Sequence, residues 1–478
     1  MEMSGVRERP GLTRAAGGVP VDLVTLKLLP PLVRPGTIRR PVLGRLAGAD
    51  PRRIISVVAP PGYGKTTLLA QWAELSGTAF AWVSVDERDN DPRILLSYVA
   101  QALDAVQPVG QRVFDALASA ASSVPGSVVP RLGAAFASMT VPVVLVLDDV
   151  HVLANRQGRD ALSILAEHVP PGSRLVLAGR AAPPLRVARL RAEGRLLEVG
   201  PADLALTRPE AAALLREAGL ALGQGEVAAL HQRTEGWPAG LHLAALHLAA
   251  PHLREGGSLG PAAVSFGGDD RLVSEYIRAE FLATISRRHR EFLTRTAMLE
   301  RMSGPLCEAV LEGPGAAAVL AELARSDLLL VPLDRRGVWY RYHHLFRDML
   351  LAELERAEPG LLPALRRRAA AWCLANGRPA DALEYSIAAG DVDAVAQLRA
   401  RLAAEQVPSA AGASFLTAAE LRVLPMLATH LSFPEIAAQM FVSPHTVKSQ
   451  AVSLYRKLGA SSCSQAVARS RELGLLDR

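Results

Sequence analysis

The sequence predicts a chain of several domains, in which a parallel α/β sheet is followed by smaller, mostly helical domains. Two observations support this prediction. Apolar runs with the pattern of buried strands alternate with helical patterns in the first part, and helical patterns with one hairpin follow. The chain has 478 residues, which exceeds what one hydrophobic core normally organises, so roughly two to four domains are expected.

Four short apolar runs are typical of strands that are buried on both faces of a parallel sheet. They cover residues 54–58, 80–86, 143–149 and 174–179. Stretches with helical spacing, such as residues 92–106, lie between them. This alternation of strands and helices predicts a doubly wound sheet within residues 25–205.

The other boundaries are inferred from changes in composition and periodicity. Residues 1–24 are rich in Gly, Arg and Pro without periodicity, which indicates a disordered leader. Helical patterns cover 208–218, 225–233, 239–249 and 275–299, residues 256–270 have the composition of a loop, and residues 328–343 that of a hairpin. The expected domains are therefore a helical, lid-like domain at 206–270, a winged-helix-like domain at 271–355, short helical repeats at 356–405, a linker at 406–414 and a helical domain at 415–478.

Charge and cysteine content limit the possible environments and partners. The formal net charge is +6 and the sequence pI is near 9.5, which permits an anionic partner. Cys307, Cys373 and Cys463 have neither the pair spacing of a zinc site nor the even count of a disulfide framework. No stretch has the length and apolar content of a signal peptide or of a membrane span. The sequence therefore favours a cytoplasmic protein without a membrane partner.

Residues 59–66, APPGYGKT, lie between a predicted strand and a predicted helix, which is the context that a phosphate-binding loop requires. Glycines let backbone N–H groups face the phosphates, and the helix N-terminus adds positive potential. Lys65 would reach the β- and γ-phosphates, and the Thr66 hydroxyl would hold Mg²⁺. Ala59 replaces the usual first glycine, which requires a negative φ at that position. The candidate nucleotide-binding residues of this loop are Gly62, Tyr63, Gly64, Lys65, Thr66 and Thr67.

A second element disfavours the alternative that this loop is an ordinary glycine-rich turn before a helix. The run VVLVLDD ends in two carboxylates, which would place Asp148 near the metal and Asp149, as the catalytic residue, near the attacking water. Arg180 at the end of the next strand is a candidate sensor of the γ-phosphate, although a surface arginine explains it equally well. The sequence therefore predicts a site for ATP and Mg²⁺ in a P-loop NTPase sheet.

Six motifs, taken in order, resemble the signal-transduction ATPases with numerous domains (STAND), and specifically the MalT-like, large LuxR-type regulators. They are APPGYGKTTLLAQW, WVSVDERDNDP, VLVLDDVHVL, LAGRAAPPLRVARLRAEGRLLE, TEGWPAGLHLAAL and YRYHHLFRDML, within residues 26–390. The resemblance implies that Gly236 and Pro238 lie near the adenine and that His343 reaches the phosphates of the nucleotide. Without it, these residues would be interpreted as a helix start and a packed core histidine.

That resemblance also implies a switch, with an open, self-associating state that ATP favours and a closed monomer that ADP favours. Members of this family place a long helical-repeat sensor before the DNA-binding domain. Only residues 356–405 occupy that place in this chain, so the inducer is not predicted.

The block from residue 415 onward predicts four short helices, at 418–430, 434–441, 444–458 and 464–473. Ser443 is a suitable N-cap and Pro444 a suitable first residue for the third helix, and Gly459 marks its end. The tight turn before the third helix is typical of a helix-turn-helix. Apolar contacts within the bundle are expected from Ile436, Ala437, Val447, Val452 and Leu454.

This block closely resembles the LuxR-type helix-turn-helix throughout its length. The resemblance implies that Thr446, Val447 and Lys448 enter the major groove and that the fourth helix pairs with its copy in a dimer. His430 stands where the family favours Gly, and Cys463 where it often has Arg. The alternative is a small helical bundle with a basic surface. The candidate DNA-binding residues are Ser443, His445, Thr446, Val447, Lys448, Gln450, Arg456 and Lys457.

Together these features favour a nucleotide-switched transcriptional regulator in the cytoplasm, associated with the nucleoid. Its expected partners are double-stranded promoter DNA, RNA polymerase and, on activation, further copies of itself. Any ATP hydrolysis is expected to be slow and regulatory, and phosphoryl transfer to a small molecule is disfavoured because the sequence contains no acceptor-site constellation. Two alternatives stay open: an NTPase whose terminal helices only mediate protein assembly, and a signalling scaffold that binds nucleotide without turnover.

Overall fold

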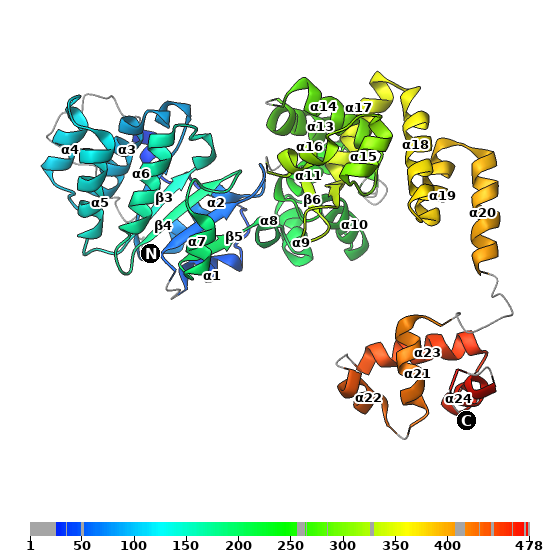
Figure 1. The fold of residues 1–478 in the computed structure, drawn as a ribbon. Helices are drawn as coiled ribbons and strands as arrows, with labels where there is room; N and C mark the ends of the chain where they lie inside the picture. The colour runs from blue at the N-terminus through cyan, green and yellow to red at the C-terminus, as the bar shows by residue number, and fades with distance from the viewer. Residues whose placement is uncertain are drawn as a thin grey trace. The chain divides into compact units, whose positions relative to one another are not determined.

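The chain divides into two compact units with a boundary after Trp372 in the computed structural model (Figure 1). The described residues are 25–34, 36–48, 52–255, 263, 265–283, 285–325, 329–406, 416–429, 431–440, 444–460, 462–472, 475 and 476. The predicted leader therefore lies outside the described residues, as do most of the predicted linker and the first part of the predicted loop at 256–270.

A five-stranded parallel sheet with the order β2-β3-β4-β1-β5 forms the base of the first unit. Its strands are β1 (Ile54–Val58), β2 (Ala79–Ser84), β3 (Val143–Asp148), β4 (Arg174–Gly179) and β5 (Leu196–Val199). The structure confirms the four predicted strands and the parallel α/β sheet. The strand β5 was not predicted, because this edge strand has only 4 residues and includes the exposed Glu198.

Helices pack on both sides of this sheet, so β3 in its interior is buried at every position. The helices of the sheet domain are α1 (Val42–Ala47), α2 (Lys65–Leu75), α3 (Pro92–Asp104), α4 (Gln111–Ala118), α5 (Val129–Ala137), α6 (Arg156–Glu167) and α7 (Val187–Ala192). Apolar residues of α3 to α6 form one core with the sheet, and α1 and α2 lie on the other side of the sheet in Figure 1. This arrangement leaves the carboxyl edge of the strands for the loops that follow them.

The helical region after the sheet leads into a small α+β region. It contains α8 (Pro201–Leu204), α9 (Arg208–Glu217), α10 (Gln224–Thr234), α11 (Pro238–Glu255), α13 (Arg271–Ile277), α14 (Arg287–Thr296), α15 (Gly304–Leu311), α16 (Ala316–Arg325), β6 (Leu330–Pro332), β7 (Tyr340–Tyr342), α17 (His344–Ala357) and α18 (Leu361–Ala375). The antiparallel pair β6 and β7 confirms the predicted hairpin. The helical patterns expected at 275–299 correspond to the end of α13, a π-helical turn, η5 (Arg278–Leu282), and α14, which begins after the Ser286 cap.

The second unit contains two helices and a four-helix bundle. The two helices are α19 (Pro379–Ala389) and α20 (Val392–Gln406), and the bundle contains α21 (Ala418–Leu427), α22 (Phe433–Met440), α23 (Pro444–Leu458) and α24 (Cys463–Glu472). The four helices of the predicted helix-turn-helix are therefore present. Gly459 has a φ of 65° directly after α23, which agrees with its predicted role in ending that helix.

Glu420 links the first and third helices of this bundle. It forms a capping box with Thr417, and its carboxylate also accepts hydrogen bonds from Lys457 Nζ at 2.8 Å and from Ser453 Oγ at 2.9 Å. The residue is only 4% exposed. Burial alone would raise the pKa of the Glu420 carboxyl, but the hydrogen bonds from Lys457, Thr417 and Ser453 outweigh burial and lower the pKa to about 2.

Glu420→Gln is therefore expected to lower the free energy of local unfolding of the bundle by about 1–3 kcal/mol, because the Lys457 ammonium loses its charged partner. Since the folded pKa of about 2 lies below the ordinary 4.5, the stabilisation is present above that ordinary value and is lost as the pH falls toward the folded value. Hydrogen exchange of the α21 and α23 amides in the full chain measures both effects. Glu435→Gln is the matched control, because this exposed glutamate caps α22 through Ser432. Equal losses in the two variants would contradict the assignment.

Candidate nucleotide site and nucleic-acid interface

The phosphate-loop candidate joins β1 to α2 at the carboxyl edge of the sheet. Gly62 and Gly64 have φ values of 77° and 79°, a left-handed conformation that glycine adopts without strain. Lys65 is 7% exposed, and its Nζ donates hydrogen bonds to the carbonyl oxygens of Ala59 at 2.7 Å and Pro60 at 3.1 Å. The lysine ammonium is thus folded over its own loop, while Thr67, two residues further along α2, is exposed.

Asp148 at the end of β3 lies directly beside the first turn of α2. The Thr66 hydroxyl donates a hydrogen bond of 2.6 Å to Asp148 Oδ2. Burial raises the pKa of the Asp148 carboxyl to about 6, partly offset by that hydrogen bond. A hydroxyl and a carboxylate this close together fit a Mg²⁺ ion, which prefers a few hard oxygen donors and completes its shell with phosphate and water oxygens.

Asp149 follows in a left-handed backbone conformation, with a φ of 61°, and its side chain is 49% exposed. His151 lies next to it, with Nδ1 at 3.6 Å from Asp149 Oδ1. This nitrogen is buried and has no hydrogen-bond partner among the described residues, and burial lowers the pKa of the imidazole. His151 was not predicted as a site residue, although its place two residues after the paired aspartates was an available signal.

Arg180 extends from the end of β4 and is paired with η5. Its Nη2 lies 2.8 Å from Glu280 Oε2, and its Nη1 donates a hydrogen bond of 3.1 Å to the Glu280 carbonyl oxygen. Both side chains are partly exposed, at 39% and 36%. Arg180, the predicted γ-phosphate sensor, is therefore paired with Glu280. It could contact a phosphate only by leaving this partner.

The start of α11 packs against the phosphate loop. Trp237 is fully buried, and its Nε1 donates a hydrogen bond of 3.0 Å to the Pro61 carbonyl oxygen. Pro238 is the first residue of α11, and Gly236 before it has a φ of 72°. A Cβ on Gly236 would lie 2.3 Å from the Leu206 carbonyl oxygen, so glycine is required there. The Gly236–Pro238 motif thus lies against the phosphate loop. The contact of Pro238 with adenine stays a prediction.

His343 is 1% exposed and packs with its ring centroid 5.8 Å from that of Trp237. Its Nε2 lies 2.8 Å from the Thr234 carbonyl oxygen, and its Nδ1 is buried with no hydrogen-bond partner in the part of the chain described here. Burial lowers the pKa of the imidazole. In this conformation His343 is a packed histidine one side chain away from the loop, and its contact with phosphate stays a prediction.

Glu235 forms ion pairs that join α10 to the hairpin region. Its carboxylate lies 2.6 Å from Arg341 Nη2 and 2.7 Å from His344 Nδ1. Although burial favours the neutral acid, hydrogen bonds from His344 and Arg341 hold the pKa of the Glu235 carboxyl far below its usual range. Tyr63 of the phosphate loop is buried beside this network, and burial together with the Glu235 charge raises the pKa of its phenol.

The third helix of the bundle, α23, carries most of the DNA-binding candidates. Lys448 and Arg456 are exposed, and Gln450 is half-buried. Lys457 is engaged by Glu420. Ser443 lies outside the described residues, and the side chains of His445 and Thr446 are not among those described.

One expectation for the core of α23 is confirmed and one is wrong. Val447 is fully buried in the core of the bundle with Ile436, Ala437 and Leu454, as expected, and its implied contact with the major groove stays a prediction that would require this side chain to become exposed. Val452, expected in that core, is 57% exposed. The physical reason is helical phase: residues five apart lie on different faces of an α-helix, so these two valines cannot share one buried stripe.

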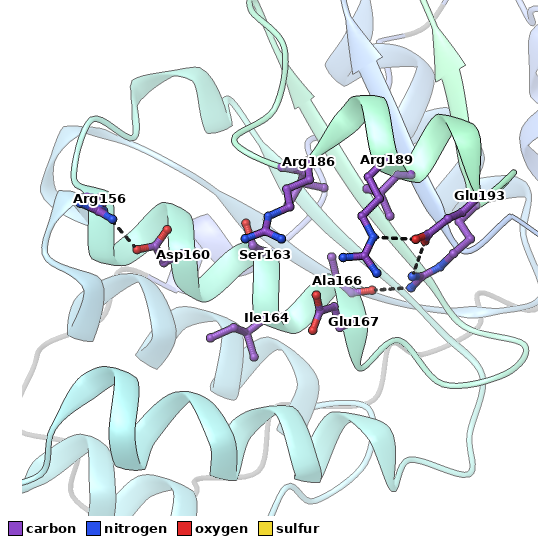
Figure 2. A pocket seen from close by; sticks show the side chains of 12 residues that line it. Arg156, Asp160, Ser163, Ile164, Ala166, Glu167, Arg186, Arg189 and Glu193 are labelled. Atoms are coloured by element: carbon purple, nitrogen blue, oxygen red, sulfur yellow. Dashed lines mark hydrogen bonds and ion pairs between the residues drawn. The ribbon is translucent and has the colours of Figure 1, made fainter.

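A separate groove of about 650 Å³ lies between α6 and α7 (Figure 2). Its arginines are largely paired with neighbouring acidic residues: Arg156 lies 3.6 Å from Asp160 and Arg189 lies 2.7 Å from Glu193. None of the predicted nucleotide-binding residues lines it. The groove is therefore separate from the predicted nucleotide site. Within the described residues, no helix combines the length and apolarity needed to cross a membrane.

Comparisons with known proteins bear on both units. Residues 278–362 match the MalT winged helix domain, and residues 414–470 match the bacterial regulatory proteins of the luxR family. The chain is 32% identical over 345 residues to the serine/threonine-protein kinase PknK of Mycobacterium tuberculosis, covering 71% of this chain and 31% of PknK. It is 31% identical over 380 residues to the HTH-type transcriptional regulator MalT of Yersinia enterocolitica, covering 77% of this chain and 41% of that MalT.

Among solved structures, the Walker-type ATPase PABY2304 of Pyrococcus abyssi aligns with a TM-score of 0.46 and 16% identity, covering 67% of this chain and 98% of that chain. The chain spans less than half the length of the curated relatives named above, 31% and 41% respectively.

The parallel sheet with its phosphate loop and the two matched domains define the class of protein. It combines a parallel sheet of the P-loop type with a LuxR-family helix-turn-helix domain. The chain is MalT-like, since it contains the MalT winged helix domain and is 31% identical to MalT of Yersinia enterocolitica over 77% of its own length. The family predicted from the sequence is confirmed.

Lys65→Ala is expected to weaken binding of ATP and ADP by about a hundredfold, because neighbouring N–H groups cannot replace the ammonium charge at the β- and γ-phosphates. Titration calorimetry with both nucleotides measures this loss. Asp149→Asn is the matched variant in the same site: it keeps a residue type that tolerates the left-handed backbone, so binding is retained and phosphate release slows. Wild-type affinity in Lys65→Ala would refute the site assignment.

Proposed function

We propose that this chain is an ATP-dependent transcriptional regulator, in which the nucleotide at the phosphate loop controls binding of promoter DNA by the LuxR-family domain. The observation that carries the proposal is the meeting of the Lys65 loop, the Thr66–Asp148 pair and Arg180 at the edge of one sheet, in the same polypeptide as a LuxR-family domain. The relative called MalT is named a transcriptional regulator, which supports the same assignment. RNA polymerase is the further partner that such a regulator requires.

Each residue of the site has a distinct role in this proposal. Lys65 neutralises the β- and γ-phosphates, and the backbone N–H groups from Gly62 to Thr67 surround them. Thr66 and Asp148 hold the Mg²⁺ that accompanies ATP, and this ion supplies positive charge against the phosphate oxygens. Asp149, at the exposed edge of the site, orients the attacking water. Hydrolysis in this proposal resets the regulator and serves no metabolic reaction.

Arg180 provides a route by which the γ-phosphate changes the conformation of the chain. Its guanidinium binds Glu280 of η5, a residue within the matched winged helix domain at 278–362. ATP draws Arg180 toward the γ-phosphate and away from Glu280, whereas ADP lacks that group and leaves the pair intact. ATP then favours an open, self-associating state because it interacts differently with the two states, which any ligand-driven switch requires.

Glu280→Gln is expected to shift the chain toward the associated state in the presence of ADP, by roughly fivefold, since a partly exposed ion pair contributes up to about 1 kcal/mol. Sedimentation velocity with ADP, with ATP and without nucleotide measures the shift. Glu275→Gln serves as the control, because its partner Arg271 lies one turn away on the exposed face of the same helix, α13. Identical ADP profiles for wild type and Glu280→Gln would remove this pair from the switch.

Lys448→Ala is expected to weaken binding of duplex DNA, since Lys448 is an exposed cation on α23. If Lys448 contacts a phosphate, its loss would weaken binding to all DNA sequences alike and reduce the slope of log K against log salt by about 0.9. If it contacts a base, its loss would reduce the binding free energy for the preferred site by about 1–3 kcal/mol. Selection from random duplexes with the full chain and ATP distinguishes the two results. Arg422→Ala removes the same charge from α21 and should leave the preferred sequence unchanged. If the wild-type chain selects no common half-site sequence from the random duplexes, the alternative in which the terminal helices mediate protein assembly becomes the better proposal.

A further inference from the structure

Two consecutive carbonyl groups of the phosphate loop accept hydrogen bonds from the lid, which is the helical region at 201–255. Trp237 Nε1 donates to the Pro61 oxygen at 3.0 Å, and the Ala239 backbone N–H donates to the Gly62 oxygen at 3.0 Å. Trp237 is fully buried, and Pro61 is also buried. Both donors flank Pro238 at the start of α11, so one short segment of the lid holds two adjacent peptide groups of the loop.

The orientation of these peptide groups decides where the next N–H groups point. In a trans peptide the carbonyl and the following N–H point in opposite directions, and the described residues contain no cis peptide bond. Since the Pro61 and Gly62 carbonyls face the lid, the N–H groups of Gly62 and Tyr63 face away from it. Within the described residues neither N–H donates a hydrogen bond, so both are available to an acceptor.

Contact between lid and loop is too close for any side chain at Gly62. A Cβ there would lie 2.5 Å from Ala239 Cβ and 2.8 Å from Trp237 Nε1 of the lid, and 2.9 Å from the Tyr276 hydroxyl of α13. The φ of 77° at Gly62 also disfavours any other residue. The glycine therefore serves the approach of the lid as well as the turn of the loop.

We infer that Trp237 is a positioning residue for phosphate binding: its indole N–H, together with the Ala239 amide, holds the loop so that the Gly62 and Tyr63 amides face the phosphates of the nucleotide. This inference rests on the proposed nucleotide site and adds to it a residue with a role separate from adenine contact. A phosphate loop binds through such inward backbone N–H groups. Their alignment before the ligand arrives lowers the cost of ordering them on binding.

Trp237→Phe tests the inference, because it removes the indole N–H and keeps an aromatic ring in the buried position. Competition binding with ADP and with adenosine is measured on the full chain. ADP affinity is expected to fall about fivefold to tenfold, the effect of one lost hydrogen bond and a loosened loop, while adenosine, which has no phosphate, binds as in wild type. Trp82→Phe is the matched control, since Trp82 is also fully buried and donates one hydrogen bond, to Ser84 within β2.

The ratio of the two affinities separates positioning from damage to the fold, because a weakened lid reduces adenosine and ADP binding alike. Equal losses for both ligands, or unchanged ADP affinity in Trp237→Phe, would overturn the inference while leaving the nucleotide site in place. Wild-type protein that binds no ADP would overturn the proposed function itself, and the inference with it. A selective loss for ADP in Trp237→Phe, absent from Trp82→Phe, would support the inference.

Discussion

The lid meets the phosphate loop at Gly62 at a distance that excludes a Cβ atom, and much of the first unit is organised around that contact. The sheet brings the loop to its carboxyl edge, and α11 closes over it with the Trp237 and Ala239 hydrogen bonds. Close packing of this kind transmits displacement, because packed interiors have few voids in which a shift can be absorbed. A movement of the lid therefore changes the backbone that is proposed to hold the phosphates.

Ion pairs extend this contact into the matched winged helix domain. Glu280 binds Arg180 from the sheet, and Arg341 and His344 bind Glu235 at the end of α10. All five residues in these pairs are partly exposed, with side-chain exposures from 19% to 48%, so each pair contributes modestly. Several ion pairs of modest strength are compatible with a conformational switch. A ligand that binds one state more tightly than the other can offset a free-energy difference of a few kcal/mol between them.

Sequence patterns predicted the elements whose structure depends on local composition. They did not predict features that depend on residues distant in the chain. Buried apolar runs predicted β1 to β4, whereas the short β5 carries too few residues to stand out. Helical spacing showed that α23 is amphipathic without fixing its phase: Val447, Ala451, Leu454 and Leu458 form the buried stripe, and Val452 lies outside it. The partner of Arg180 is 100 positions away and that of Lys457 is 37 positions away, so neither ion pair could be predicted. The roles of the site residues themselves stay predictions.

The Trp237 indole and the Pro61 oxygen are 176 positions apart in the chain. A fragment that ends after β5 would keep the whole sheet, the Lys65 loop and both aspartates, yet it would lack the donors that orient the loop. Such a fragment has the sequence motif of a nucleotide site without its complete architecture. For the same reason, exchanging the sheet domain between relatives preserves the loop only when the segment around Trp237 and Ala239 is exchanged with it.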